Sequence, residues 1–347
     1  MRLPRRDAPL RILIVKLSSL GDIIHTTGCL SAVRAALPSA HVTMAVEERW
    51  ADAVRHHPHV DALVLASPRD RVTVGYALEV RRLLARHGPF DMALDLQGNR
   101  RSALWTYLSG APRRVGRGGM RPGWQLALSP NLTRHAVTVS ADVCEAAGIA
   151  VADPSPVLYT GVAEDAALVQ RLHDADLPLD GFVVINPFSR WPSKGIPLET
   201  TAGIIRELRS RTALPLLLSG GPDDTPQADA LRAMLGEGDM VSLVGLLSLG
   251  EALCLYRRAR LMVSCDSGPM HAAAALGTPV VALFGPTHPE RTGPWGPGHA
   301  VIQAQRPAQH HAYRHDPEAV HMRAIDAMQV VEAVLAQLVH EPPKPVP

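Results

Sequence analysis

The chain has 347 residues, of which 46% are hydrophobic and 20% are charged. This composition excludes an intrinsically disordered chain, and the length is sufficient for two domains with separate cores. The formal net charge of +2 conceals an uneven distribution. Residues 1–175 carry 21 Lys and Arg against 16 Asp and Glu, whereas residues 176–347 carry 14 against 17, so the two halves are expected to bind different partners.

The four cysteines are scattered, without the paired spacing of a zinc site or a redox dithiol, which is typical of a protein of the reducing cytosol. Residues 1–9 are polar and basic, and the apolar run after them is short and interrupted by Lys16. We therefore expect neither a signal peptide nor a transmembrane helix there. No later apolar run reaches the length of a membrane span, so any membrane contact is expected to be peripheral.

The first half of the chain alternates short apolar runs with amphipathic segments, which predicts a parallel sheet covered by helices. The expected strands are residues 10–17, 42–46, 62–65 and 92–96, and the expected helices are residues 23–37, 74–87, 99–108 and 137–147. Residues 115–119 are rich in glycine and are expected to form a flexible loop. Asp22 follows the first strand, where open α/β sheets bind ligands, and it either serves a ligand or caps the next helix.

The second half repeats the pattern. The expected strands are residues 181–187, 214–218, 241–243, 261–265 and 279–284, and the expected helices are residues 198–211, 226–235, 249–258 and 321–339. Residues 310–321 contain four histidines, but their spacing fits neither a helix face nor a hairpin, and no metal site is expected.

Residues 261–276 combine the end of a buried strand with the start of a helix, so a strand-to-helix turn is expected between them. The first N–H groups of such a helix have no internal partner and lie at its positive end, which suits a phosphate at Ser267 and Gly268. His271 could donate to the same anion, and Asp266 could accept from ribose hydroxyls or orient the loop. The alternative is a capped turn with a core histidine.

Residues 81–121 contain nine arginines against two aspartates. Guanidinium groups suit phosphate and carboxylate, so this region either binds an anionic partner or is a solvated basic face. The nine are Arg81, Arg82, Arg86, Arg100, Arg101, Arg113, Arg114, Arg117 and Arg121.

A diphosphate site in one domain and a carboxylate in the other indicate group transfer, with the carboxylate as general base on an incoming hydroxyl. The chain has no GxxxxGK[ST] sequence, so a P-loop kinase is not expected. The first strand-to-helix turn lacks GxGxxG, which argues against a nicotinamide dehydrogenase.

Three segments together resemble glycosyltransferase family 9. They are RILIVK running into SSLGDIIHT at residues 11–26, SCDSGPMH at residues 264–271, and LFGPT at residues 283–287. The resemblance covers residues 11 to about 339. Within the family, VEE at residues 46–48, DLQG at residues 95–98 and HAV at residues 135–137 look more like heptosyltransferase I than heptosyltransferase II.

This resemblance implies a GT-B fold, in which two Rossmann-like parallel-sheet domains face each other across a cleft. It also implies an inverting, metal-independent transfer of heptose from ADP-L-glycero-D-manno-heptose to a Kdo sugar of lipid A, with no cofactor. The enzyme would be cytoplasmic and peripheral on the inner face of the bacterial inner membrane, with no nucleic-acid partner. The alternatives are a family 9 transferase with another nucleotide sugar or acceptor, a GT-B-like sugar-nucleotide epimerase, and a non-catalytic nucleotide-binding protein.

The resemblance also assigns roles to residues. Asp22 would be the general base, and Asp224 stands where heptosyltransferase I usually has a glutamate. The donor nucleotide would be bound by Ser189, Lys194, Asp224, Asp266, Ser267, Gly268 and His271. From the arginine cluster rather than from the resemblance, we expect contacts to the anionic acceptor from Arg100, Arg101, Arg113, Arg114, Arg117 and His135.

The expected domains follow from these assignments. Residues 1–160 form an N-terminal acceptor-binding domain, and residues 161–325 form a C-terminal nucleotide-sugar-binding domain. Residues 326–340 form a C-terminal packing helix, and residues 341–347 form a disordered tail.

Overall fold

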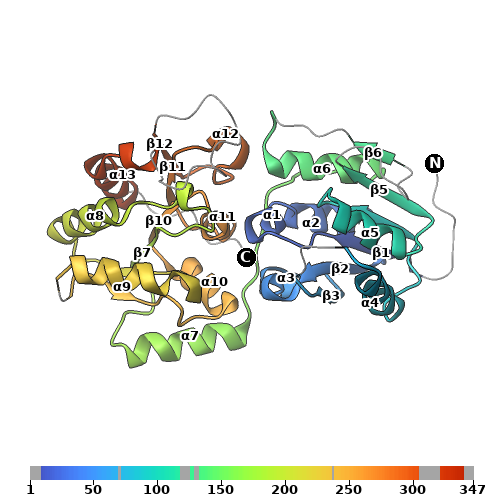
Figure 1. Ribbon diagram of the computed structural model, residues 1–347, viewed down its shortest axis with the longest axis horizontal. Coiled ribbons are helices and arrows are strands. Elements are labelled where there is room, and N and C mark those ends of the chain that lie inside the picture. Colours follow the sequence, from blue (N-terminus) through green and yellow to red (C-terminus); the bar gives the residue numbers. More distant parts are fainter. Residues whose placement is uncertain are drawn as a thin grey trace. The chain divides into compact units, whose positions relative to one another are not determined.

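The computed structural model describes residues 9–68, 72–117, 126–128, 133–236, 238–304 and 321–339. The chain divides into two compact units, Met1–Tyr159 and Thr160–Pro347 (Figure 1). The histidines at positions 310, 311 and 315 and the tail 341–347 lie outside the described residues.

The first unit contains a parallel sheet of six strands in the order β3-β2-β1-β4-β5-β6. Residues 12–15 of β1 are completely buried, as expected for an apolar strand covered on both faces. The strands are β1 (Arg11–Val15), β2 (His41–Glu47), β3 (Ala62–Ala66), β4 (Met92–Asp95), β5 (Arg113–Arg117) and β6 (Leu126–Leu128). The helices are α1 (Leu20–Ile24), α2 (Thr27–Ala36), α3 (Asp52–Arg55), α4 (Val74–Ala85), α5 (Arg100–Leu108) and α6 (Ala136–Ala146), with a 3-10 turn at Glu48–Trp50.

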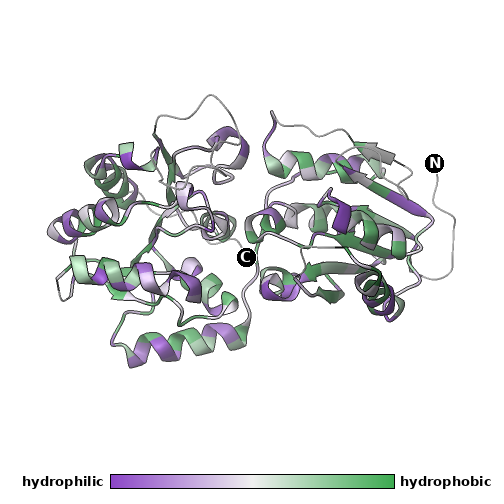
Figure 2. Cartoon of the chain, in the orientation of Figure 1, coloured by the Kyte–Doolittle hydropathy of each residue, from purple (hydrophilic) through white to green (hydrophobic). Residues whose placement is uncertain are grey.

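Helices cover both faces of this sheet. Tyr76 and Val80 of α4 and Trp105 of α5 share a core with Leu13 of β1, while α2 and α6 pack against each other. The central strands are apolar, whereas β5 carries three arginines in its five residues (Figure 2).

The second unit contains another parallel sheet of six strands, in the order β12-β11-β10-β7-β8-β9. Its strands are β7 (Val183–Asn186), β8 (Leu216–Leu218), β9 (Val241–Ser242), β10 (Leu261–Cys265), β11 (Val280–Phe284) and β12 (Ala300–Gln303). Its helices are α7 (Val162–Asp174), α8 (Leu198–Arg211), α9 (Thr225–Met234), α10 (Leu249–Arg258), α11 (Gly268–Ala275), α12 (Pro289–Thr292) and α13 (Ala327–Val339), with 3-10 turns at Pro192–Lys194, Pro222–Asp224 and Met322–Ala324. Residues of α8, α9 and α13 close one apolar core against the strands.

The two sheets have the same topology. Numbered within each unit, the strand order is 3-2-1-4-5-6, the order of doubly wound dinucleotide-binding folds. The order reverses between β1 and β4 in the first unit and between β7 and β10 in the second. Ligands of such sheets bind beyond the carboxyl ends of the strands at this switch point.

The structure corrects three sequence-based expectations. Residues 115–117 of the expected loop at 115–119 belong to strand β5, because Arg113–Arg117 pairs with both β4 and β6. Residues 118 and 119 lie outside the described residues. The helix expected at 23–37 is divided into α1 and α2. The final helix α13 begins at Ala327 rather than at residue 321, after a separate 3-10 turn. Helix α7 was not predicted.

Across the described part of the chain, no helix has both the length and the hydropathy that crossing a membrane requires.

Candidate functional site

Asp22 is the third residue of α1, directly beyond the carboxyl end of β1. Ser19, the N-cap of this helix, donates its hydroxyl and its backbone N–H to Asp22 Oδ2, at 2.9 and 3.3 Å. Asp22 therefore is not the N-cap that the sequence left open as an alternative. It supports the start of the helix from the third position, as the acidic member of a capping box does.

Lys16 and Arg117 converge on one carbonyl oxygen at the switch point of the first sheet. Lys16 Nζ and Arg117 Nε donate to Leu96 O, at 3.3 and 3.2 Å. The Lys16 side chain is only 1% exposed. Next to this carbonyl, the buried Asp95 accepts through Oδ1 from the backbone N–H groups of Gln97 and Gly98, at 3.0 and 2.9 Å.

Charge and burial shift the proton affinities of this cluster. Burial alone would raise the pKa of Asp22, but the charge of Lys16, then that of His25 and the Ser19 hydrogen bonds, lower that pKa well below its ordinary value. Burial lowers the pKa of Lys16 to about 8, with Asp22 opposing that shift. Burial raises the pKa of Asp95 to about 6. Asp22 therefore stays ionised at neutral pH.

His135, expected at the acceptor, lies close to this cluster. It is the N-cap of α6, and its ring stands edge-on to the ring of His25, with 5.5 Å between the centroids. His25 is itself close enough to Asp22 to lower the pKa of Asp22. Two residues predicted from the sequence, Asp22 and His135, thus each lie close to a buried histidine, His25, that was not predicted.

The arginines of β5 lie at opposite ends of that strand. Arg113 is in register with Met92 at the start of β4, whereas Gly116, next to Arg117, is in register with Asp95 at its end. Arg117 consequently lies where the strands have their carboxyl ends and such sheets bind ligands, which we call the ligand edge. Arg113 and Arg114 lie at the opposite edge, near the amino-terminal ends of the strands. There, Arg113 donates to Ala147 O, and Arg114 donates to Ala111 O, each at 2.6 Å.

Arg100 and Arg101 both begin α5, but their environments differ. Arg100 is exposed. Arg101 is bound within its unit: it pairs with the buried Glu47 and donates to the Tyr76 hydroxyl at 2.8 Å and to Ser67 O at 2.6 Å. Arg101 thereby ties the end of β2 to the loop after β3 and to α4.

In the second unit, Asp266 joins the predicted donor residues. It follows β10, whereas Lys194 lies in the loop after the adjacent strand β7. Lys194 Nζ lies 2.8 Å from Asp266 Oδ2, and His271 Nε2 lies 3.9 Å from Asp266 Oδ1. These groups, buried or nearly so, bring two cation-capable side chains to the switch point of the sheet.

The turn after β10 has the expected form. Ser267 is the N-cap of α11, and Gly268 and Pro269 are its first two residues, so the N–H groups at the start of this helix lie at the turn. The Ser264 and Ser267 hydroxyls are 3.3 Å apart. Ser189, in the loop that carries Lys194, accepts from the Trp191 N–H at 3.3 Å.

Asp224 closes a neighbouring turn after β8. Its Oδ2 accepts from Gly221 N at 2.8 Å, and burial together with the charge of Asp223 raises the pKa of Asp224. A Cβ at Gly220 would lie 2.7 Å from the Phe188 ring and 2.9 Å from the Asp224 carboxylate. Only glycine at position 220 allows this close packing.

One further buried residue of the second site was not predicted from the sequence. Asn186, the last residue of β7, is 2% exposed and donates through Nδ2 to Ser219 O at 2.8 Å. It ties the ends of β7 and β8 together. Its position at the end of an apolar strand is the feature that could have identified it.

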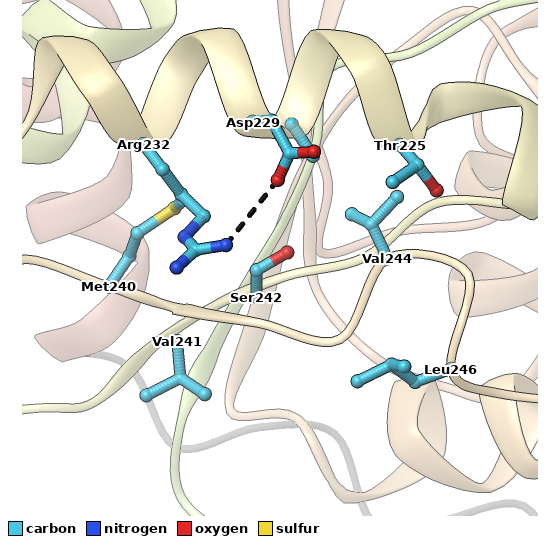
Figure 3. A pocket seen from close by; sticks show the side chains of 9 residues that line it. Thr225, Asp229, Arg232, Met240, Val241, Ser242, Val244 and Leu246 are labelled. Carbon is cyan, nitrogen blue, oxygen red and sulfur yellow. Dashed lines mark hydrogen bonds and ion pairs between the residues drawn. The ribbon is translucent and has the colours of Figure 1, made fainter.

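A separate cavity of about 450 Å³ lies between α9 and β9. Figure 3 shows the Arg232–Asp229 ion pair, 3.4 Å long, along one side, with Met240 and Val241 below it. Thr225 lines it, but its lining includes none of the predicted donor residues.

Solved structures share this two-unit architecture. A glycosyl transferase family 9 structure from Veillonella parvula matches with a TM-score of 0.83, 24% identity, and coverage of 96% of this chain and 98% of that chain. E. coli heptosyltransferase WaaC with ADP matches with a TM-score of 0.72, 23% identity, and coverage of 94% and 100%. The fold is therefore that of the GT-B glycosyltransferases, built from two Rossmann-like parallel-sheet units.

Sequence comparison identifies the family. The profile of glycosyltransferase family 9 (heptosyltransferase) matches residues 79–321. The chain is 29% identical to lipopolysaccharide heptosyltransferase 1 of Pseudomonas aeruginosa over 83% of this chain and 82% of that protein. The chain belongs to glycosyltransferase family 9 (heptosyltransferase). Heptosyltransferases 2 and 3 are also among the matching relatives.

The buried Asp95 carries a testable pH dependence. Its folded pKa of about 6 lies above the ordinary value of 3.8, so the folded state binds the proton more tightly and loses stability as pH rises through this interval. Asp95→Asn keeps the accepting oxygen and removes the charge. We expect its free energy of unfolding, relative to that of the wild type, to rise by about 2 kcal/mol between pH 4.5 and 7.5, which the difference between the two melting temperatures measures. Parallel pH profiles of the two proteins would contradict this.

Proposed function

We propose that the protein transfers heptose from ADP-L-glycero-D-manno-heptose to a Kdo sugar of lipid A, in assembly of the lipopolysaccharide inner core. The observation that carries this proposal is the ionised Asp22 carboxylate, held by Ser19 at the switch point of the first sheet. The name of the Pseudomonas aeruginosa relative, lipopolysaccharide heptosyltransferase 1, supports heptose transfer to lipopolysaccharide, and the E. coli heptosyltransferase structure with ADP supports the donor nucleotide.

The proposed chemistry is a displacement with inversion. Asp22 Oδ1 accepts the proton of the acceptor hydroxyl as that oxygen forms a bond to the anomeric carbon. The bond between the anomeric carbon and the diphosphate oxygen breaks, and ADP leaves with the electron pair. Its growing charge is stabilised by Lys194, His271 and the first N–H groups of α11. Because these groups supply positive charge, the proposed reaction proceeds without a metal ion.

The function is tested by incubating the protein with ADP-heptose, with and without Kdo-lipid A, and measuring ADP release and the mass of the glycolipid. Release that depends on the acceptor, with addition of one heptose, is expected. Release of free sugar without acceptor would indicate an epimerase or hydrolase instead. Transfer only to a lipid that already carries heptose would indicate the activity named in the heptosyltransferase 2 relatives.

Asp22→Asn tests the base. We expect turnover to fall by about 10²- to 10⁴-fold, the usual cost of losing a positioned base. ADP affinity, measured by calorimetry, should stay within a few fold because the proposed donor contacts are in the second unit. A folded variant that retains more than half the wild-type rate would leave Asp22 only its part in starting α1.

Lys194→Ala tests the diphosphate site. Loss of a charge-assisted hydrogen bond should weaken ADP binding about tenfold or more and slow transfer. Arg209→Ala, an exposed change on α8, is the matched control and should leave both unchanged. EDTA should not change the rate. Loss of activity in EDTA that a divalent ion restores would contradict the metal-independent assignment.

Arg117→Ala tests the acceptor site against an internal control. Arg117 lies at the ligand edge and Arg113 at the opposite edge of the same strand. Arg117→Ala should raise the acceptor KM about tenfold or more and leave the donor KM unchanged. Arg113→Ala should change neither. An equal effect of the two substitutions would mean that no acceptor anion is bound at this edge.

We also propose peripheral binding of the enzyme to an anionic membrane through α4. Val74 and Leu78 are 80% and 51% exposed, and the exposed Arg81 lies on the same side of the helix. Apolar side chains flanked by arginines suit a negatively charged lipid surface.

Replacing both Arg81 and Arg82 by alanine should weaken vesicle binding roughly thirtyfold, from about 1 kcal/mol for each basic residue. Flotation with vesicles of increasing anionic lipid content measures this, and wild-type binding should weaken as salt rises. Binding that ignores anionic lipid and salt would exclude α4 as the membrane surface.

A further inference from the structure

Gln97 uses one half of its side-chain amide inside the fold and leaves the other half unused. Its Oε1 accepts from the backbone N–H of Ser18 at 3.0 Å. Because an N–H group must face the oxygen of the amide and not its nitrogen, this contact fixes which way the amide is turned. Within the described part of the chain Nε2 has no hydrogen-bond partner, and Gln97 is partly exposed. Gln97 therefore offers an N–H donor to a ligand beyond the end of β4.

This donor is anchored beside the Asp22 carboxylate. Ser18, which binds Gln97, is followed by Ser19, whose N–H and hydroxyl both donate to Asp22 Oδ2. The Cα atoms of successive residues are at most about 3.8 Å apart, so the two side chains are held by one short stretch of backbone. That stretch joins β1 to α1, and β1 pairs with β4. Gln97 and Asp22 thus follow the two strands between which the strand order reverses.

The loop that carries Gln97 is held in place by its own contacts. Asp95 Oδ1 accepts from the N–H groups of Gln97 and Gly98. Gly98 has a φ of +79°, and a Cβ there would lie 2.8 Å from the carbonyl oxygen of Arg117. Only glycine suits this conformation and this close approach of β5. With its backbone bound to Asp95 and its side chain to Ser18, Gln97 would lose little conformational entropy on binding a ligand.

Gln97 and Arg117 suit different parts of an acceptor. Arg117, which donates through Nε to Leu96 O at the same edge, carries a full charge and suits a carboxylate or a phosphate. The amide of Gln97 is neutral, and its N–H groups suit an uncharged sugar oxygen. The fold itself uses only the acceptor atom of this amide, which a glutamate would supply equally well.

We propose that Gln97 Nε2 donates a hydrogen bond to the acceptor sugar, at the oxygen on a carbon next to the one whose hydroxyl Asp22 deprotonates, and thereby determines which hydroxyl attacks the anomeric carbon. The inference rests on the proposed function, whose acceptor and general base it uses. The bonds formed and broken are those of the proposed reaction. Contact at two neighbouring oxygens fixes the orientation of the sugar ring, so that one hydroxyl is presented to the donor.

The experiment compares the wild type with Gln97→Met and Gln97→Glu, using ADP-heptose and Kdo-lipid A. Glutamate keeps an acceptor for the Ser18 N–H and removes the donor, whereas methionine removes both without adding charge. Each variant should lower kcat/KM for the acceptor about two- to tenfold, the effect of one neutral hydrogen bond, and leave the donor KM unchanged. Gln97→Glu should lose at least as much as Gln97→Met. Gln329→Glu, the same change at an exposed position of α13, is the matched control and should change neither constant.

The second readout uses Kdo-lipid A analogues in which hydrogen replaces the oxygen on one or the other carbon next to the reacting one. One of the two analogues should lower kcat/KM of the wild type about two- to tenfold and have no further effect on Gln97→Met, because the contact is already absent. The same comparison with Gln97→Glu, which keeps the Ser18 contact, replaces it if Gln97→Met does not fold.

The third readout is the position of the new linkage, determined by ¹³C NMR of the product. The wild type should form one linkage, and Gln97→Met should form a second one at a neighbouring hydroxyl. A single, unchanged linkage in the product of Gln97→Met would overturn the role of Gln97 in selecting the hydroxyl.

The remaining outcomes separate this inference from the proposed function. Wild-type kinetics in Gln97→Glu beside an impaired Gln97→Met would show that Gln97 serves only the Ser18 N–H, and would overturn the inference. An equal response of wild type and Gln97→Met to both analogues would do the same. Both results leave the proposed function intact. No transfer by the wild type to Kdo-lipid A would refute the proposed function and this inference with it.

Discussion

The strand order 3-2-1-4-5-6, present in both units, is the constraint on which the rest of the structure depends. At the switch point, the chain leaves two neighbouring strands toward opposite faces of the sheet, so the loops at their carboxyl ends separate. Polar groups in these loops can reach a ligand in the crevice between them. Asp22 and Arg117 in the first unit, and Lys194 and Asp266 in the second, all lie at or just beyond a strand's carboxyl end.

The electrostatics of the two switch points differ in kind. In the second unit, Lys194 and Asp266 form a close ion pair, with His271 near the other carboxylate oxygen. In the proposed reaction an incoming diphosphate would compete with Asp266 for Lys194, so the carboxylate would orient the ammonium but also limit its affinity for anions. In the first unit, the Lys16 ammonium is buried and donates to a backbone carbonyl oxygen, while the Asp22 carboxylate keeps partial exposure.

Much of the fold could be predicted from the sequence because the central strands of both sheets are mainly apolar runs. Helices α8 and α10 and strand β10 begin and end at the expected residues. Strand β5 was missed since its pattern, RRVGR, has arginines at both ends and a glycine within; pairing on both sides with β4 and β6 overrides its weak intrinsic preference. The Lys194–Asp266 pair joins residues distant in sequence, but both follow buried strands, so their meeting could be anticipated from parallel topology.

The arginine cluster shows what composition alone could not resolve. Its nine members form one local surplus of charge in the sequence, yet the described ones separate into different environments. Arg81 is solvated on α4, Arg101 is bound to Glu47, and β5 holds Arg113 and Arg117 at opposite edges of the sheet. Strand register decides this separation, and register is a property of pairing between distant segments. A count of charges therefore predicts the sign of the field around the unit, while the direct contact to an anion depends on which arginine the sheet brings to its ligand edge.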